Sequence, residues 1–169
     1  MKSIALMRSG VAIMSASVAN FDGEKMSVLK FIVDTGATRT TIPKQTLADE
    51  LGYSEEYIDN NKILLSENEK PLMADGKRAD VYKLKAPRIN IGGHELQPDY
   101  ILTSDVVLSL NLLLGLDVLS YFNFHFNFDA IDEDASHGRM FYEFRQSRFK
   151  PFTKLDEPFA YKLSDSDGQ

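Results

Sequence analysis

The chain has 169 residues and no cysteine, so a disulfide framework, a zinc–thiolate site and a cysteine nucleophile are excluded. Basic residues are in the minority: 19 Lys and Arg stand against 25 Asp and Glu, and the formal net charge is −6. This balance argues against a nucleic-acid backbone or an anionic membrane as the main partner. A long apolar run is also missing, because polar residues and a glycine interrupt the best candidate, 106–119. No membrane span is expected.

The beginning of the chain needs a separate test, because Lys2 and the apolar residues after it are similar to a secretory signal. Arg8-Ser9-Gly10 divides the apolar stretch, whereas a signal peptide has a continuous apolar centre. We therefore expect a first β-strand here and a cytoplasmic protein, with secretion as the less favoured alternative. The length and the 43% hydrophobic content suit one globular domain.

Short strands separated by turns are the main pattern along the chain. Residues 11–19 and 27–33 are apolar runs around a polar turn, which predicts a hairpin. Helical segments are expected at 44–51, 54–58 and 117–121, and further strands at 81–84, 89–91, 100–102, 112–114, 122–128 and 140–144. In 122–128, phenylalanine occupies every second position, so one face of that strand is expected in the core or in a dimer interface. Residues 59–70 are expected to form a surface excursion anchored by Ile63-Leu64-Leu65. Many short strands with turn signals are typical of a mostly β barrel or sandwich.

The segment with chemical information is Phe31-Ile32-Val33-Asp34-Thr35-Gly36-Ala37-Thr38. An apolar strand ends here by presenting a carboxylate on a turn, where glycine permits a close backbone approach and threonine can bond nearby backbone. A carboxylate in such a place is costly without partners, which makes Asp34 a candidate site residue. A second element lies downstream: three leucines, then Gly115, Leu116 and Asp117.

These motifs resemble the retropepsin family, the single-domain aspartic proteases of retroviruses and of their cellular and bacterial relatives. In that family an apolar strand leads into Asp-Thr/Ser-Gly-Ala, and a flap hairpin, an apolar triplet, a glycine and a short helix follow. Here residues 34–37, the Asp75-Gly76 hairpin signal and residues 112–119 match in order and approximate spacing, within residues 11–144. The Gly-Leu-Asp form of the last element is more similar to the cellular and bacterial branch than to the viral one.

The resemblance implies a mostly β fold, a closed barrel of the retropepsin type with one or two short helices, and a homodimeric aspartic endopeptidase in which Asp34 is catalytic. The residues that it places in support of the catalytic loop are Thr35, Gly36, Ala37 and Thr38. The residues that it places in a flap over the peptide substrate are Ala74, Asp75, Gly76 and Lys77. Gly115 and Asp117 are expected as structural residues near the site. The protease domain is expected at 1–144, with a partly ordered C-terminal extension at 145–169.

Peptide hydrolysis by carboxylates independently requires two of them around one water: one takes the water's proton and the other polarises the carbonyl. The chain has one Asp-Thr-Gly after an apolar strand, and residues 165–168 lie in a polar stretch without such a strand. The second carboxylate is therefore expected from a second copy of the chain across a two-fold axis. Asp117 is the alternative within the chain, although we expect it to accept hydrogen bonds near Thr38 or Arg39.

Other site types fit less well. Residues 34–38 also suit a phosphate loop of the actin and sugar-kinase class, but that class needs two large domains. A calcium loop is suggested by four residues at suitable intervals, Asp132, Asp134, Ser136 and Glu143, but His137 stands where such a loop requires glycine. The histidines lack the spacing of metal ligands: His94, His125 and His137. No metal or organic cofactor is expected. The remaining alternative is a catalytically silent module of the same fold that dimerises or binds peptides.

Overall fold

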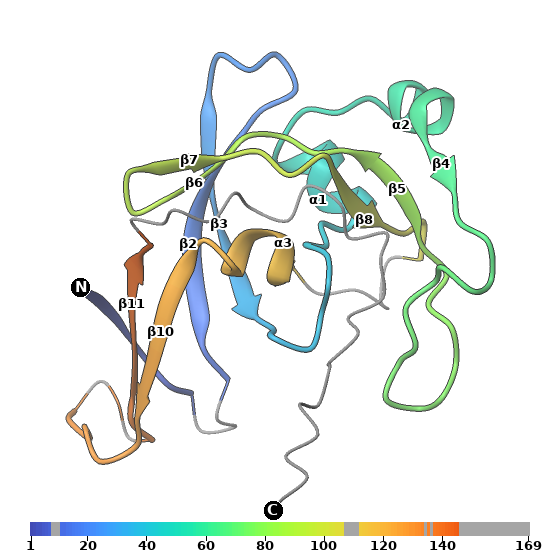
Figure 1. Cartoon of the computed structure of the whole chain (residues 1–169). Helices are drawn as coiled ribbons and strands as arrows, with labels where there is room; N and C mark the ends of the chain where they lie inside the picture. The colour runs from blue at the N-terminus through green and yellow to red at the C-terminus, as the bar shows by residue number, and fades with distance from the viewer. Residues whose placement is uncertain (8–10, 107–111, 134, 136, 146–169) are drawn as a thin grey trace, which may run out of the picture.

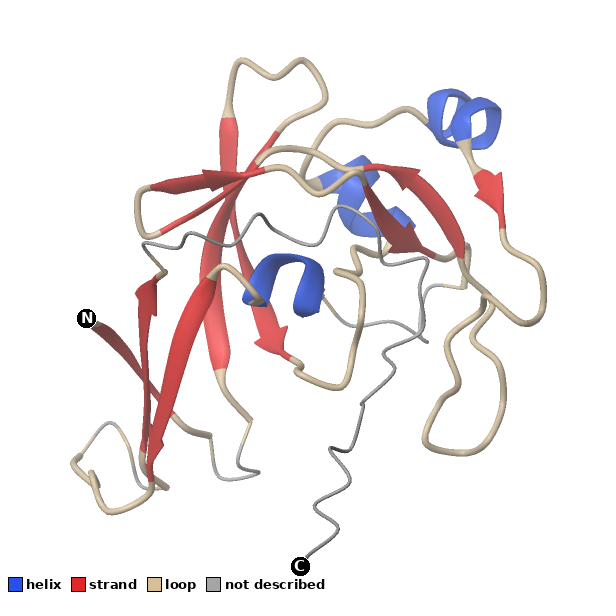
Figure 2. Ribbon diagram, in the orientation of Figure 1, coloured by secondary structure: helices blue, strands red, loops and turns tan. Residues whose placement is uncertain are grey.

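The protein is described by a computed structural model that covers residues 1–7, 11–106, 112–133, 135 and 137–145. Strands dominate it, which confirms the mostly β class (Figure 2). The strands are β1 (Lys2–Ala5), β2 (Ile13–Ala19), β3 (Met26–Val33), β4 (Ile63–Leu64), β5 (Tyr82–Lys85), β6 (Ile89–Ile91), β7 (His94–Leu96), β8 (Tyr100–Thr103), β9 (Leu113–Leu114), β10 (Phe122–Asn127) and β11 (Arg139–Phe144). The helices are short: α1 (Lys44–Asp49), α2 (Glu55–Asn61) and α3 (Leu116–Leu119). These helices lie at the three segments where the residue pattern predicts them, whereas the family resemblance implies only one or two.

The described strands form three sheets, with the orders β1-β11-β10, β7-β6-β2-β3-β9 and β4-β5-β8 (Figure 1). The hairpin of β2 and β3 is antiparallel, whereas β3 and β9 run parallel and pair Ile32 with Leu113. Thr41 bridges both Leu102 of β8 and Leu113 of β9, which joins the second and third sheets. The sheets do not form one continuous ring among the described residues, so a closed barrel stays a prediction.

Alternating side chains along β2 explain how the core is built. Met14, Ala16 and Val18 point inward and are almost completely buried, while the serine at 15 points outward. This period of two is the expected pattern of a strand with one face on the core. The expected helix near residue 44 is also present, with Leu47 and Leu51 fully buried.

The expected turn after Ser54 is the helix α2. The Ser54 hydroxyl accepts a hydrogen bond from the Tyr57 amide at 3.1 Å and satisfies one free donor of the first helical turn. The expected first strand is present as β1, which pairs with β11. No helix in the described ranges is long and apolar enough to cross a membrane.

The phenylalanine side chains on one face of β10 become more exposed toward the end of the strand. Phe122 is only 5% exposed, whereas Phe126 is 42% and Phe128 65% exposed. Phe126 and Phe128 stack on each other, with ring centroids 6.4 Å apart. The strand and its period are as predicted, but only its first part contributes to the core.

One expectation about the surface is wrong, and another concerns residues outside the described part of the chain. In the segment 63–65, Ile63 and Leu64 are exposed and only Leu65 packs inward, against Ala79, Val81 and Leu102. The reason is that β4 is an edge strand of two residues whose side chains face solvent. The C-terminal extension after Arg145 falls outside the described residues, as do Asp134 and Ser136 of the rejected calcium loop.

Candidate active site

Asp34 follows the last residue of β3 and stays attached to the sheet. Its amide donates to the Leu114 carbonyl at 3.1 Å, which continues the pairing of β3 with β9. Its own carbonyl accepts from the Ala37 amide at 3.2 Å, so residues 34–37 form a tight turn. The half-buried side chain accepts the Gly36 amide on Oδ1 at 2.9 Å. An Asx turn of this kind fixes the direction of the carboxylate. Thr35 and Thr38 are exposed.

A Cβ at Gly36 would lie 3.2 Å from Asp34 Oδ1, a tight contact that requires the carboxylate oxygen to move by a few tenths of an ångström. Any larger residue would press on the carboxylate oxygen that the turn holds in place. The sequence expectation that a glycine permits a close backbone approach thus has a specific geometric meaning here.

The turn is tied to the start of α3 by main-chain hydrogen bonds. The amides of Leu116 and Asp117 donate to the carbonyls of Ala37 and Thr38 at 2.8 and 3.2 Å. These amides belong to the first helical turn, whose donors have no partner within the helix. The segment after Asp34 therefore supplies acceptors that a helix start needs, and the two elements fix each other.

Thr40 and Asp117 form a buried polar contact behind this turn. Asp117 accepts from the Thr40 amide at 2.9 and 3.0 Å on its two oxygens, and from the Thr40 hydroxyl at 2.7 Å. The same hydroxyl accepts from the Gly115 amide at 3.2 Å. Burial raises the pKa of the Asp117 carboxyl, while the Thr40 hydrogen bonds and the charge of Arg39 act in the opposite direction. Asp117 is thus an internal acceptor with both oxygens in use.

Gly115 lies directly against the backbone of Arg39. A Cβ here would approach the Arg39 nitrogen to 2.8 Å and the carbonyl oxygen to 2.6 Å, distances that real Cβ atoms do not show. Its φ of −94° is accessible to any residue, so the requirement for glycine is steric. The Arg39 guanidinium itself lies over the Tyr100 ring, 3.9 Å from the centroid, and donates to the Tyr100 hydroxyl.

The predicted flap is a hairpin, but its turn is not the two-residue type I′ turn that an Asp-Gly pair favours in β-hairpins. The Gly76 amide donates to the Met73 carbonyl at 2.9 Å, so Ala74 and Asp75 are the central residues. Gly76 follows with φ of +80°, and no described residue other than glycine has positive φ. Asp75 instead accepts the Lys77 amide on Oδ1 at 3.0 Å. This is the three-residue hairpin in which a left-handed glycine follows a type I turn.

The predicted residues therefore fall into two groups in space. The structure brings residues 34–38 together with Gly115 and Asp117. Ala74, Asp75, Gly76 and Lys77 are exposed at the tip of a separate hairpin, at the lower right of Figure 1. Among the described residues, no hydrogen bond or ion pair joins this tip to the Asp34 turn.

Sequence reasoning missed Thr40. It placed Asp117 near Thr38 or Arg39, whereas the side-chain contacts are with Thr40, which is fully buried. The run from 38 to 41 contains three threonines, and composition does not say which hydroxyl points inward. The useful signal is Ile42, an apolar residue that is fully buried. In an extended segment every second side chain lies on the same face, so residue 40 lies on the buried face together with Ile42.

Solved structures with a similar fold include a retropepsin-like aspartic protease. The crystal structure of a retropepsin-like aspartic protease from Rickettsia conorii is 22% identical, over 82% of this chain and 87% of that chain, with a TM-score of 0.49. No family model and no curated protein matches the chain. The function proposed for this chain rests on its own residues.

Proposed function

We propose that the protein is an aspartic endopeptidase that acts as a homodimer, with one Asp34 from each subunit around a shared water. The observation that carries the proposal is the Asp34 turn: a half-buried carboxylate follows a core strand, and one oxygen is fixed by Gly36. The other oxygen, Oδ2, accepts no hydrogen bond from the residues that the structure describes. A fixed carboxylate with one oxygen open is suited to hold and deprotonate water.

The second carboxylate is the reason for proposing a dimer. Asp117 is the alternative carboxylate in the chain segments that form the site, but both of its oxygens accept hydrogen bonds from Thr40. A two-fold axis beside the Asp34 turn supplies an equivalent carboxylate from a second copy. Two carboxyl groups in contact share one proton, which gives the acid and the base that hydrolysis requires.

Two further features support a dimer that acts on peptides. Phe126 and Phe128 leave an exposed aromatic surface on and after β10, which a second copy can cover. The hairpin around Gly76 is exposed and suited to lie over an extended peptide and exclude water. The proposal includes closure of the curled sheets into a retropepsin-like barrel, and its chemistry uses neither metal nor organic cofactor.

The test is cleavage of a proteome-derived peptide library by the wild-type chain and by Asp34→Asn. The substitution is nearly isosteric, but it removes the general base and the shared proton, so we expect turnover to fall by a factor on the order of 10²–10⁴ or more. Unchanged circular dichroism and thermal unfolding would show that the fold is retained. A pepstatin-type inhibitor should block the wild-type activity.

Two outcomes would contradict the proposal. Comparable turnover by Asp34→Asn would move catalysis to another residue, with Asp117 as the next candidate. Peptide binding without any cleavage by the wild-type chain would instead favour the catalytically silent module.

A further inference from the structure

A cavity separate from the Asp34 turn lies at the other end of β3, beside the turn that connects β2 to β3. It has a volume of about 210 Å³ and is lined by Phe21, Tyr53, Tyr57 and the segment 85–88. Phe21 precedes β3 and Asp34 follows it, so the length of this strand separates the two places (Figure 1). Nothing in the proposed peptidase mechanism uses this cavity.

Three aromatic rings form one wall of the cavity. The centroid of the Phe21 ring lies 4.6 Å from that of Tyr57 and 5.0 Å from that of Tyr53, all in edge-to-face arrangements. Tyr53 is only 9% exposed and firmly placed, while Phe21 is 48% exposed. A rigid aromatic wall with one open ring is the kind of surface that binds proline and aromatic side chains.

Two cationic side chains, Lys85 and Arg88, also line the cavity. Arg88 is held in place, because it donates to the Gly23 carbonyl at 2.8 Å and pairs with Glu95 at 3.2 Å. Lys85 is exposed and has no ion pair within the described part of the chain. The cavity therefore suits an apolar ring whose neighbour in the sequence is a carboxylate.

The chain itself contains such a sequence beyond its described part. Residues 146–169 include four aromatic residues, Phe149, Phe152, Phe159 and Tyr161, whereas segments that lack any partner are poor in aromatics. Pro-Phe occurs twice. The first, Pro151-Phe152, follows a lysine, and the second, Pro158-Phe159, follows Asp156-Glu157. Only the second matches the charge of Lys85.

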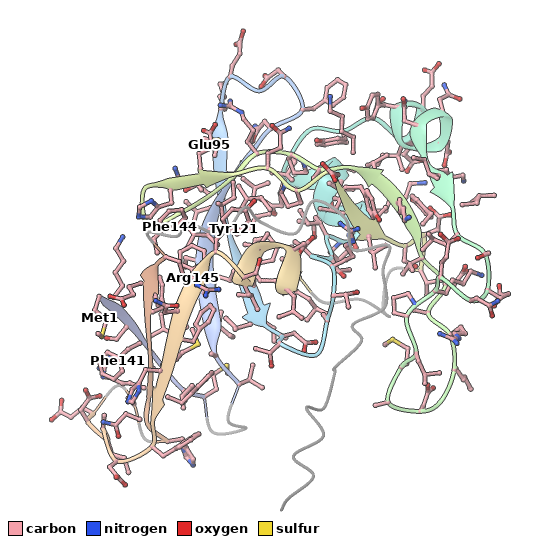
Figure 3. The ribbon with its side chains drawn as sticks, in the orientation of Figure 1. Met1, Glu95, Tyr121, Phe141, Phe144 and Arg145 are labelled. Carbon is pink, nitrogen blue, oxygen red and sulfur yellow. The ribbon has the colours of Figure 1, made fainter. Side chains whose placement is uncertain are left out.

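The end of β11 places this segment within reach. Phe144 is the last residue of β11 (Figure 3), and its ring stacks on the ring of His94 in β7 with centroids 3.9 Å apart. β7 pairs with β6, and the residues just before β6 line the cavity, about 10 Å further along the hairpin. The stretch from Arg145 to Pro158 spans up to about 45 Å when extended, which exceeds this separation.

We propose that residues 156–161 of the C-terminal segment dock into this cavity of their own chain. Pro158 and Phe159 lie on the rings of Phe21 and Tyr57, and the carboxylates before them pair with Lys85. A small site of this size gives a weak contact on its own. The tether supplies an effective concentration in the millimolar range, which makes the intramolecular contact the favoured one.

The test uses the full chain, whose lack of cysteine permits a single spin label at Ser164→Cys. In the ¹⁵N-labelled protein we expect paramagnetic broadening of the amides at 20–24, 53–58 and 85–88, relative to a diamagnetic label. Phe159→Ala and Lys85→Glu should abolish most of this broadening. Phe152→Ala is the matched control and should leave it unchanged. Combining Lys85→Glu with Glu157→Lys should restore it.

Three results would overturn the proposal. The first is broadening on another surface or none at all, and the second is broadening that Phe159→Ala does not reduce. The third is broadening that appears in a mixture of spin-labelled ¹⁴N protein and unlabelled ¹⁵N protein, because it would show that the segment docks on a second copy.

Discussion

Thr40 connects the two chain segments that form the candidate site, the segment after Asp34 and the start of α3. Its hydroxyl donates to Asp117 and accepts from Gly115, and its amide also donates to Asp117. One side chain thus joins the segment after Asp34 to the start of α3. Removing this hydroxyl would leave a buried carboxylate and a buried amide each with one partner fewer.

Thr40→Val is therefore expected to lower the free energy of unfolding by about 1–3 kcal/mol, since the shape is kept and two buried partners lose a hydrogen bond. Thr38→Val is the matched control: Thr38 is exposed, and its replacement should change stability by no more than about 0.5 kcal/mol. Urea unfolding followed by circular dichroism measures both. Equal stability losses would show that the Thr40 hydroxyl has no special role.

Asp117 should give the unfolding free energy a distinct pH dependence. Burial raises the pKa of this carboxyl above its ordinary 3.8, so the folded chain binds the proton more tightly than the unfolded chain. Between the ordinary and the raised value the native state holds more protons, and this contribution to stability is lost as pH rises through that window. Asp117→Asn should remove that fall while keeping an acceptor for Thr40. Urea unfolding at several pH values tests it, and an unchanged slope in the variant would contradict the assignment.

At the scale of elements, the hairpin of residues 71–79 and the β2–β3 hairpin give a matched pair of turns. Gly76 and Gly23 have φ of +80° and +73°, and neither has an atom within 4 Å of a Cβ position. Valine is strained in both places by on the order of 1–3 kcal/mol. The hairpins differ in burial: Leu72 and Met73 near Gly76 are 64% and 42% exposed, whereas β2 and β3 lie in the core.

Gly76→Val should reduce peptide turnover with little change in global stability, because the tip of its hairpin buries almost nothing and can change conformation locally to relieve the strain. Gly23→Val should do the reverse, lowering stability while the activity of the folded protein is retained. Hydrogen exchange is a second measurement, with fast exchange expected at amides 73–78 and slower exchange with a peptide-like inhibitor bound. Full activity of Gly76→Val, or equal protection with and without inhibitor, would place the flap elsewhere, with the Gly92-Gly93 turn as the next candidate.

Other elements show what the sequence alone can predict. The β2–β3 hairpin, the helix around Leu47 and the Ser54 cap follow from local patterns, and all three are present. The turn type that the Asp75-Gly76 pair predicts is wrong, because a dipeptide does not determine which two residues occupy the centre of a turn. The prediction that Ile63 and Leu64 anchor their segment is wrong, since both are exposed. Their burial depends on which sheet edge the strand joins, and the sequence does not show this.

The candidate site was predictable only in part for a similar reason. Asp34 and Gly115 can be recognised from the sequence alone, because each directly follows an apolar strand. The contact of Thr40 with Asp117 joins positions 77 residues apart, and its selection among neighbouring hydroxyls depends on how β8 and β9 flank residues 40–42. Such pairings follow from tertiary packing, which local propensity does not encode.

At the scale of the whole molecule, the proposed activity depends on concentration. Specific activity should fall on dilution below the dimer dissociation constant, because a monomer presents only one Asp34. Sedimentation measured over the same concentrations would give the fraction of dimer. A large excess of Asp34→Asn should suppress the wild-type activity by forming mixed dimers. Constant specific activity from a demonstrated monomer would contradict the dimer and leave catalysis to one chain.

The parallel pairing of β3 with β9 also has a consequence for how the protein reaches its working state. The Asp34 turn closes only when residues near 113–117 arrive, and the loop between them must first lose much of its conformational entropy. Contacts of such long sequence separation form late and slow the folding of β proteins. During synthesis the turn therefore stays incomplete until most of the chain has left the ribosome. The proposed peptidase activity would therefore be absent while the unfolded segments of the chain are most open to cleavage.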